Sequence, residues 1–106
     1  MAEKRAQIVR LEGDWDISRR DELERLLQPA YAWTGGVILD LQGVGYADST
    51  ILAALVVLRN QRRTKGLPVP SLVLGTLQVR RLLSISGLGE AFPTYDSVEA
   101  AEAASL

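Results

Sequence analysis

The chain has 106 residues, of which 47% are hydrophobic and 24% are charged, and this composition is typical of one globular domain covering residues 1–106. It contains neither cysteine nor histidine, which excludes disulfide bonds, zinc sites built on those side chains and Ser-His or Cys-His nucleophile pairs. A net charge of -1 disfavours binding to nucleic acid through a general electrostatic attraction.

The first third of the chain predicts a strand followed by an amphipathic helix. Residues Gln7 to Glu12 alternate imperfectly between polar and apolar side chains, and Gly13 is expected to end this strand. Ser18 is a favourable N-cap for the helix, which Pro29 should end or kink. The apolar side chains of the helix recur every three or four residues and form one stripe, made of Leu23, Leu26, Leu27, Ala30 and Tyr31.

The middle third predicts a buried strand and a long helix. Residues Val37 to Leu41 form a nearly continuous apolar run, as in strands that are buried on both faces. A loop that contains two glycines should follow over Gln42 to Gly45. The next helix is expected to begin at about Ser49 or Thr50 and to end at Lys65.

The two halves of this long helix differ in character. Its first half is apolar on nearly every side, so some apolar surface is left over for a partner, with Ile51, Val57 and Leu58 as candidates. Its second half carries a basic cluster, made of Arg59, Arg62, Arg63 and Lys65. We interpret this cluster as a solvated face whose positive charges complement the negative end of the helix dipole. The alternative interpretation is a contact with phosphate or nucleic acid.

The last third predicts two further strand and helix pairs. Ser71 to Leu74 reads as an apolar strand, and the helix after it should be capped by Thr76 and stopped by Gly87. A short edge strand is expected over Phe92 to Tyr95, followed by a final helix capped by Ser97. The third helix should bury its apolar positions, which are Val79, Leu82, Leu83 and Ile85. Strands that alternate with helices indicate an α/β fold with a largely parallel sheet.

Neither end nor middle of the chain predicts a membrane segment. Residues Met1 to Ala6 lead directly into the first strand without a signal-peptide core, and the apolar run from Ile51 to Leu58 is far shorter than the ~20 residues that span a bilayer. We therefore expect a cytoplasmic protein that does not insert into membranes.

Several segments, in this order and spacing, resemble the STAS domain family, the module shared by anti-sigma factor antagonists and the tails of sulfate transporters. The matching segments cover nearly the whole chain and are Leu11–Asp16, Leu39–Val44, Tyr46–Thr50, Val79–Leu83 and Ser86–Leu88. The resemblance implies a single STAS-like α/β domain with a mostly parallel or mixed sheet of four to five strands, covered by about four helices.

The resemblance also implies a phosphorylation switch. In the family an Asp-Ser-(Ser/Thr) triplet opens the second helix and its first hydroxyl is phosphorylated, which corresponds here to Ser49 between Asp48 and Thr50. The implied partner is an anti-sigma factor that is also a serine kinase: the unmodified antagonist binds it and releases the sigma factor, and a serine phosphatase restores the modified antagonist. No cofactor, metal or catalytic residue is implied, and the expected protein is a bacterial signalling module rather than an enzyme.

The predicted partner-binding residues are Asp16, Asp48, Ser49, Thr50 and Ile51. Two of them lie outside the triplet: Ile51, which departs from the family pattern, and Asp16, which lies in an earlier loop. The family usually has glycine after the triplet, where this chain has Ile51, and this branched side chain is expected to narrow kinase access or to reshape the docking surface. Asp16 either shapes a docking loop beside Ser49 or has only a turn or cap role.

Other interpretations of these residues stay open. Asp48 and Ser49 also read as a plain helix cap, and Trp15 reads as a core residue more readily than as an exposed anchor. One rival function is a constitutive STAS-like docking subunit of a signalling assembly or of a membrane lipid transporter, without phosphorylation. Another is an enzyme that uses Asp40 and Asp48 at the ends of strands, although no base, nucleophile pair or phosphate cradle accompanies them.

Overall fold

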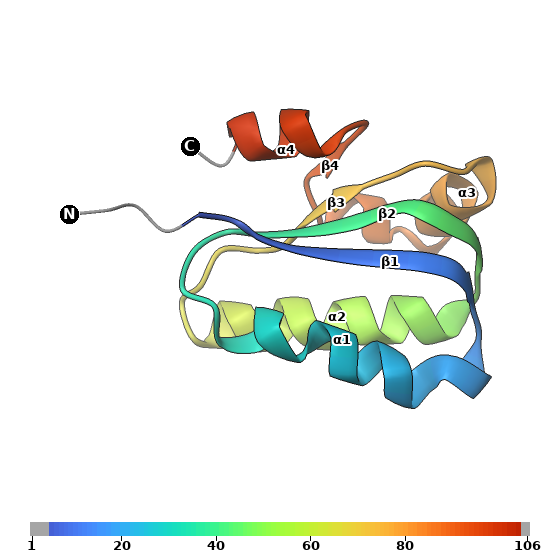
Figure 1. Ribbon diagram of the computed structural model, residues 1–106, viewed down its shortest axis with the longest axis horizontal. Helices are drawn as coiled ribbons and strands as arrows, with labels where there is room; N and C mark the ends of the chain where they lie inside the picture. Colours follow the sequence, from blue (N-terminus) through green and yellow to red (C-terminus); the bar gives the residue numbers. More distant parts are fainter. Residues whose placement is uncertain (1–4, 105–106) are drawn as a thin grey trace.

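The computed structural model describes residues 5–104, which form four parallel strands in the spatial order β1-β2-β3-β4 (Figure 1). The strands are β1 (Gln7–Trp15), β2 (Val37–Ala47), β3 (Ser71–Val73) and β4 (Thr94–Tyr95). The helices are α1 (Arg20–Ala32), α2 (Ser49–Thr64), α3 (Leu77–Ser86) and α4 (Val98–Ala104), with 3-10 turns at Ile17–Arg19 and Leu88–Glu90. The predicted α/β class, with four strands and four helices in the described part, is confirmed.

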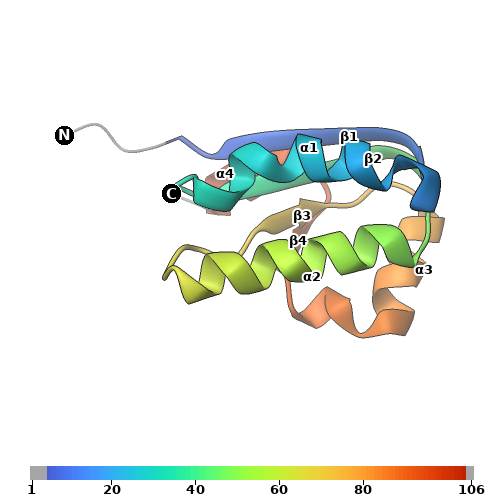
Figure 2. The same cartoon turned by 90° about the horizontal axis from the view of Figure 1, so that it is seen from below.

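The helices lie on both faces of the sheet. α1 and α2 cover one face side by side, as Figures 1 and 2 show, and α4 covers the other. The main core fills the space between the sheet and α1, α2 and α3. Its largest fully buried side chains are Leu11, Trp15, Leu23, Leu27, Leu39, Leu41, Ile51, Leu55, Leu58 and Leu72. A smaller cluster of Ile38, Val73 and Ala101 lies under α4. Each fully buried aliphatic side chain contributes about 1.5–3 kcal/mol, so this core is the main source of stability.

Both long strands run past the ends predicted for them. β1 continues beyond Gly13 to Trp15, and β2 continues through the expected loop to Ala47. Gly13 has φ of +88°, and the pairing shifts register on either side of it, so the glycine supports a bulge instead of ending the strand. A Cβ on Gly43 would lie 3.0 Å from the Glu12 side chain, so this glycine allows close pairing with β1.

α1 begins differently from the prediction. Ser18 is not its N-cap: the Asp16 carboxylate instead accepts a hydrogen bond from the Ser18 amide at 2.9 Å and caps the 3-10 turn that precedes α1. Pro29 lies inside α1 and does not end it. The predicted apolar stripe is buried at Leu23, Leu27 and Ala30, whereas Leu26 is 39% exposed.

Arg62 contradicts the prediction of a solvated basic face. Its side chain is 0% exposed, and the guanidinium donates to four backbone carbonyls, those of Ala30 and Trp33 at 2.7 Å, Pro68 at 2.8 Å and Gly35 at 2.9 Å. Burial lowers the pKa of this guanidinium below its ordinary value. The side chain therefore ties the end of α1 to the loops before β2 and β3, while Arg63 and Lys65 are exposed as expected.

The last third of the chain mostly follows the prediction. Thr76 accepts a hydrogen bond from the Val79 amide and caps α3, and Gly87 ends it with φ of +77°. Ser97 caps α4 through the Ala100 amide at 3.0 Å. The expected burial of Ile85 is wrong, because this side chain is 86% exposed on the outer side of α3. Within residues 5–104, no helix is both long and apolar enough to cross a membrane.

Candidate functional site

The connections that follow β1, β2 and β3 meet at one end of the molecule because the strands are parallel (Figure 1). The Asp48 amide donates a hydrogen bond to the Trp15 carbonyl at 3.2 Å, which holds the first two connections together. Asp16 and Asp48, each directly after a strand, are therefore brought to the same end of the molecule.

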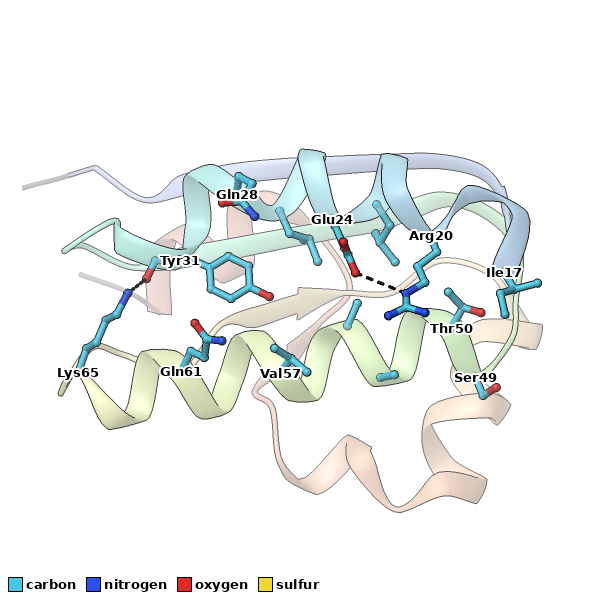
Figure 3. A pocket seen from close by; sticks show the side chains of 14 residues that line it. Ile17, Arg20, Glu24, Gln28, Tyr31, Ser49, Thr50, Val57, Gln61 and Lys65 are labelled. Atoms are coloured by element: carbon cyan, nitrogen blue, oxygen red, sulfur yellow. Dashed lines mark hydrogen bonds and ion pairs between the residues drawn. The ribbon is translucent and has the colours of Figure 1, made fainter.

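α2 begins at this end with a well-formed cap. Asp48 has an extended backbone, and its carboxylate accepts a hydrogen bond from the Thr50 amide at 2.8 Å. Ser49 is the first residue of α2 and is exposed, and its hydroxyl has no hydrogen-bond partner among residues 5–104. In the close-up of Figure 3, Thr50 points into the groove between α1 and α2, whereas Ser49 lies at its outer end. The Ser49 hydroxyl is thus open to a reagent from solvent.

The structure corrects the role expected for Ile51. Its side chain is 1% exposed and packs in the main core, so it neither faces a partner nor stands over the Ser49 hydroxyl. Leu58, also considered partner-facing, is 0% exposed, while Val57 is 45% exposed as expected. The helical period explains the difference, because positions 51, 55 and 58 lie on one side of α2 and position 57 lies on another.

A groove of about 730 Å³ runs between α1 and α2 and begins at Ser49 and Thr50 (Figure 3). Ile17, which is 73% exposed, stands at the same end. The other lining residues follow helical spacing and are Arg20, Leu23, Glu24, Leu27, Gln28, Tyr31, Ala53, Ala54, Val57, Gln61 and Lys65. Sequence reasoning missed Ile17, and its only signal was an isolated aliphatic residue in a polar turn.

Charged groups beside the groove are mostly paired. Arg20 bonds Glu24 at 3.4 Å across one turn of α1. Lys65, at the far end, donates to the Tyr31 carbonyl at 3.4 Å, and burial raises the pKa of the Tyr31 phenol. The pKa of Asp16 is lowered, first by the hydrogen bond from the Ser18 hydroxyl and then by that from the Ser18 amide.

A polar residue that sequence reasoning also missed touches the strand end just before this site. The side-chain amide of Gln78, in the first turn of α3, accepts a hydrogen bond from the Ala47 amide at 2.9 Å and donates one to the Ala47 carbonyl at 2.8 Å. Nothing in the local sequence marks this glutamine, because its partner is 31 residues away.

The acidic residues considered for enzyme or metal chemistry are dispersed. Asp40 is buried and accepts a hydrogen bond from Arg10 at 3.0 Å, whereas Asp48 caps α2. The two carboxylates therefore do not form a shared site. Across residues 5–104, no group of three or more His, Cys, Asp or Glu side chains is arranged to hold a metal ion.

Comparisons with known proteins agree on the fold. A family model described as "Mlab, STAS domain" matches residues 2–94. A crystal structure of an anti-sigma factor antagonist from Mycobacterium paratuberculosis is 21% identical with a TM-score of 0.81, and the match covers 99% of this chain and 89% of that one. The anti-sigma factor antagonist SpoIIAA in its unphosphorylated form is 17% identical with a TM-score of 0.70, covering 98% and 91%. A sulfate transporter family protein from Wolinella succinogenes is 21% identical with a TM-score of 0.73, covering 94% and 84%.

Proposed function

This chain belongs to the STAS domain family, and from that membership we propose that it is an anti-sigma factor antagonist switched off by phosphorylation of Ser49. The unmodified protein binds a cytoplasmic anti-sigma factor that is also a serine kinase, and so releases a sigma factor. A serine phosphatase reverses the modification. The protein itself acts by binding and not by catalysis. The single observation that carries the proposal is the exposed, unpartnered hydroxyl of Ser49 at the start of α2.

The burial of Ile51 supports access to this hydroxyl. A branched residue in place of the usual glycine raised the expectation of a blocked serine, but the side chain of Ile51 packs into the core. Asp48 holds the first turn of α2 through the Thr50 amide, so the serine is presented on a defined backbone.

The expected energetics favour a switch that leaves the fold intact. A phosphate on Ser49 adds about −1.5 to −2 charges at pH 7. At an exposed helix N-terminus, the dipole stabilises such a charge by roughly 0.3–1 kcal/mol. In a packed interface, an unpaired charge costs about 2–5 kcal/mol. Because the interface cost is larger, phosphorylation should dissociate the complex without unfolding the domain.

The partner surface should include apolar contacts beside Ser49. Ile17 is 73% exposed and lines the same end of the groove as Ser49 and Thr50. Protein interfaces typically combine an apolar centre with a polar rim, and an exposed aliphatic side chain such as Ile17 suits the apolar part. Asp16, exposed in the turn just before Ile17, contributes to the rim of this surface.

A constitutive docking subunit, in a signalling assembly or a membrane lipid transporter, is the second candidate. The similar fold of a sulfate transporter family protein favours it, since STAS-like folds are not confined to antagonists. In this role the Asp48–Thr50 cap would be structural and Ser49 would stay unmodified.

Incubation with the cognate anti-sigma factor kinase and ATP tests the proposal. We expect one phosphate on Ser49 by intact-mass analysis and peptide mapping, none in Ser49→Ala, and one in the matched control Thr50→Ala. Ser49→Asp should lose binding to the anti-sigma factor while its circular dichroism spectrum stays that of the wild type. An unmodified Ser49 in this assay, and in protein recovered from both growing and stressed native cells, would favour the constitutive subunit.

A further inference from the structure

The end of β2 extends beyond the strand that should pair with it. β3 pairs with β2 only as far as Asp40, opposite Val73, whereas β2 continues to Ala47. In a parallel strand the amide and the carbonyl of one residue point to the same side. Both groups of Ala47, a residue that is 0% exposed, would be left buried and unpaired on the side away from β1.

Gln78 fills this gap with one side chain. Its amide oxygen accepts from the Ala47 N–H at 2.9 Å, and its amide nitrogen donates to the Ala47 carbonyl at 2.8 Å, so it stands in for one residue of a neighbouring strand. Thr76 makes a related contact, because its hydroxyl donates to the Val44 carbonyl at 3.1 Å. The N-terminal turn of α3 thus takes the place of the missing length of β3.

The same contacts fix the peptide unit that leads into α2. The Ala47 carbonyl accepts from Gln78 on one side of this planar unit, and the Asp48 amide donates to the Trp15 carbonyl on the other. A peptide plane held at both ends cannot rotate freely, and the next residue in the chain is Ser49.

We propose that Gln78 is a positioning residue for Ser49, which holds the start of α2 in the orientation that presents the serine hydroxyl to the kinase. The part of this inference that concerns the kinase rests on the proposed function. The part that concerns the order of the turn from Ala47 to Ser49 stands on the hydrogen bonds alone.

Gln78→Glu tests the inference because its effect can be reversed by protonation. The carboxylate accepts from the Ala47 N–H but cannot donate to the Ala47 carbonyl, which it would face at close range. The protonated carboxyl restores both bonds. An acidic side chain suits the first turn of a helix, so the variant should fold. Ser84→Glu, at an exposed position on the same helix, is the matched control for added charge.

The first readout combines amide hydrogen exchange rates with amide chemical shifts, both measured by NMR. At pH 8 we expect exchange at Ala47 and Asp48, whose amides donate to Gln78 and to Trp15, to rise about tenfold in Gln78→Glu relative to Ser84→Glu. As the pH falls, the amide shifts of both residues should return to wild-type values, with a midpoint above the ordinary glutamate pKa of about 4.3, because only the neutral form fits. Unchanged exchange, or shifts that show no recovery in acid, would overturn the inference.

The second readout is the rate of Ser49 phosphorylation. A misplaced hydroxyl should lower kcat about tenfold in Gln78→Glu at pH 8 and leave KM within about twofold, because the docking surface is retained while the reacting group is displaced. A faster-exchanging turn with an unchanged kcat would overturn the positioning role. If the kinase leaves the wild type unmodified, the proposed function fails, and the exchange and titration data still decide whether Gln78 holds the turn.

Discussion

Replacing Arg62 by methionine should lower the free energy of unfolding by about 3–5 kcal/mol, because it leaves several buried backbone carbonyls without a hydrogen-bond donor. The side chain is 0% exposed and donates to four carbonyls, which belong to Ala30, Trp33, Gly35 and Pro68. These carbonyls come from the end of α1 and from two loops, so one substitution releases three segments.

The magnitude follows from opposing contributions. Hydrogen bonds to a charged group contribute roughly 1.5–3 kcal/mol each, so four bonds would suggest ~6–12 kcal/mol in total. Burial of the guanidinium costs several kcal/mol, and methionine keeps much of the packing of the aliphatic stem, which together reduce the net loss to about 3–5 kcal/mol. Arg62→Lys should fall between methionine and wild type, because an ammonium has three donors for the four carbonyls.

Equilibrium unfolding in urea, followed by far-UV circular dichroism, measures these differences. Arg63→Met is the matched control, since Arg63 is the exposed neighbour on α2, and it should change stability by less than about 0.5 kcal/mol. If Arg62→Met and Arg63→Met agree within about 1 kcal/mol, the carbonyl contacts of Arg62 do not hold the fold together and the reasoning is refuted.

Three further predictions concern the Ser49 end of the molecule. Asp48→Ala should cost about 1 kcal/mol in thermal unfolding through loss of the α2 cap, and a loss below ~0.3 kcal/mol would contradict the capping role. Ile51→Gly should cost about 3–6 kcal/mol by chemical denaturation, from a core cavity plus a helical glycine, and unchanged stability would contradict the burial of Ile51. The Ser18 hydroxyl lowers the pKa of Asp16 below its ordinary 3.8, so this stabilisation is present above that pH and is lost as the pH falls through the lower folded value. The free energy of unfolding of the wild type should therefore exceed that of Asp16→Asn most above pH ~5, and this difference should shrink toward pH ~2. A pH-independent difference would refute the stabilising role of the Ser18 hydrogen bond to Asp16.

Short-range patterns in the sequence predicted much of the site at the start of α2. The apolar run before Asp48, the aspartate itself and the hydroxyl residues after it marked a strand, a cap and a helix start, and all three occur there. Parallel strands bring their carboxyl ends together, so the meeting of Asp16 with Asp48 followed from the order of the elements. The face of α2 that Ile51 occupies was not predictable, because the first half of that helix is apolar on nearly every side.

Side-chain periodicity and capping act over a few neighbouring residues, and they were enough to predict the element order, the α/β class and the position of Ser49 at the start of the second helix. The roles of Arg62 and Gln78 depend instead on how distant elements pack together. Both side chains satisfy backbone groups that lie about thirty residues away, with separations such as 32 for Arg62 to Ala30 and 31 for Gln78 to Ala47. Buried backbone groups must find partners, and which side chain reaches them is settled when distant elements pack together.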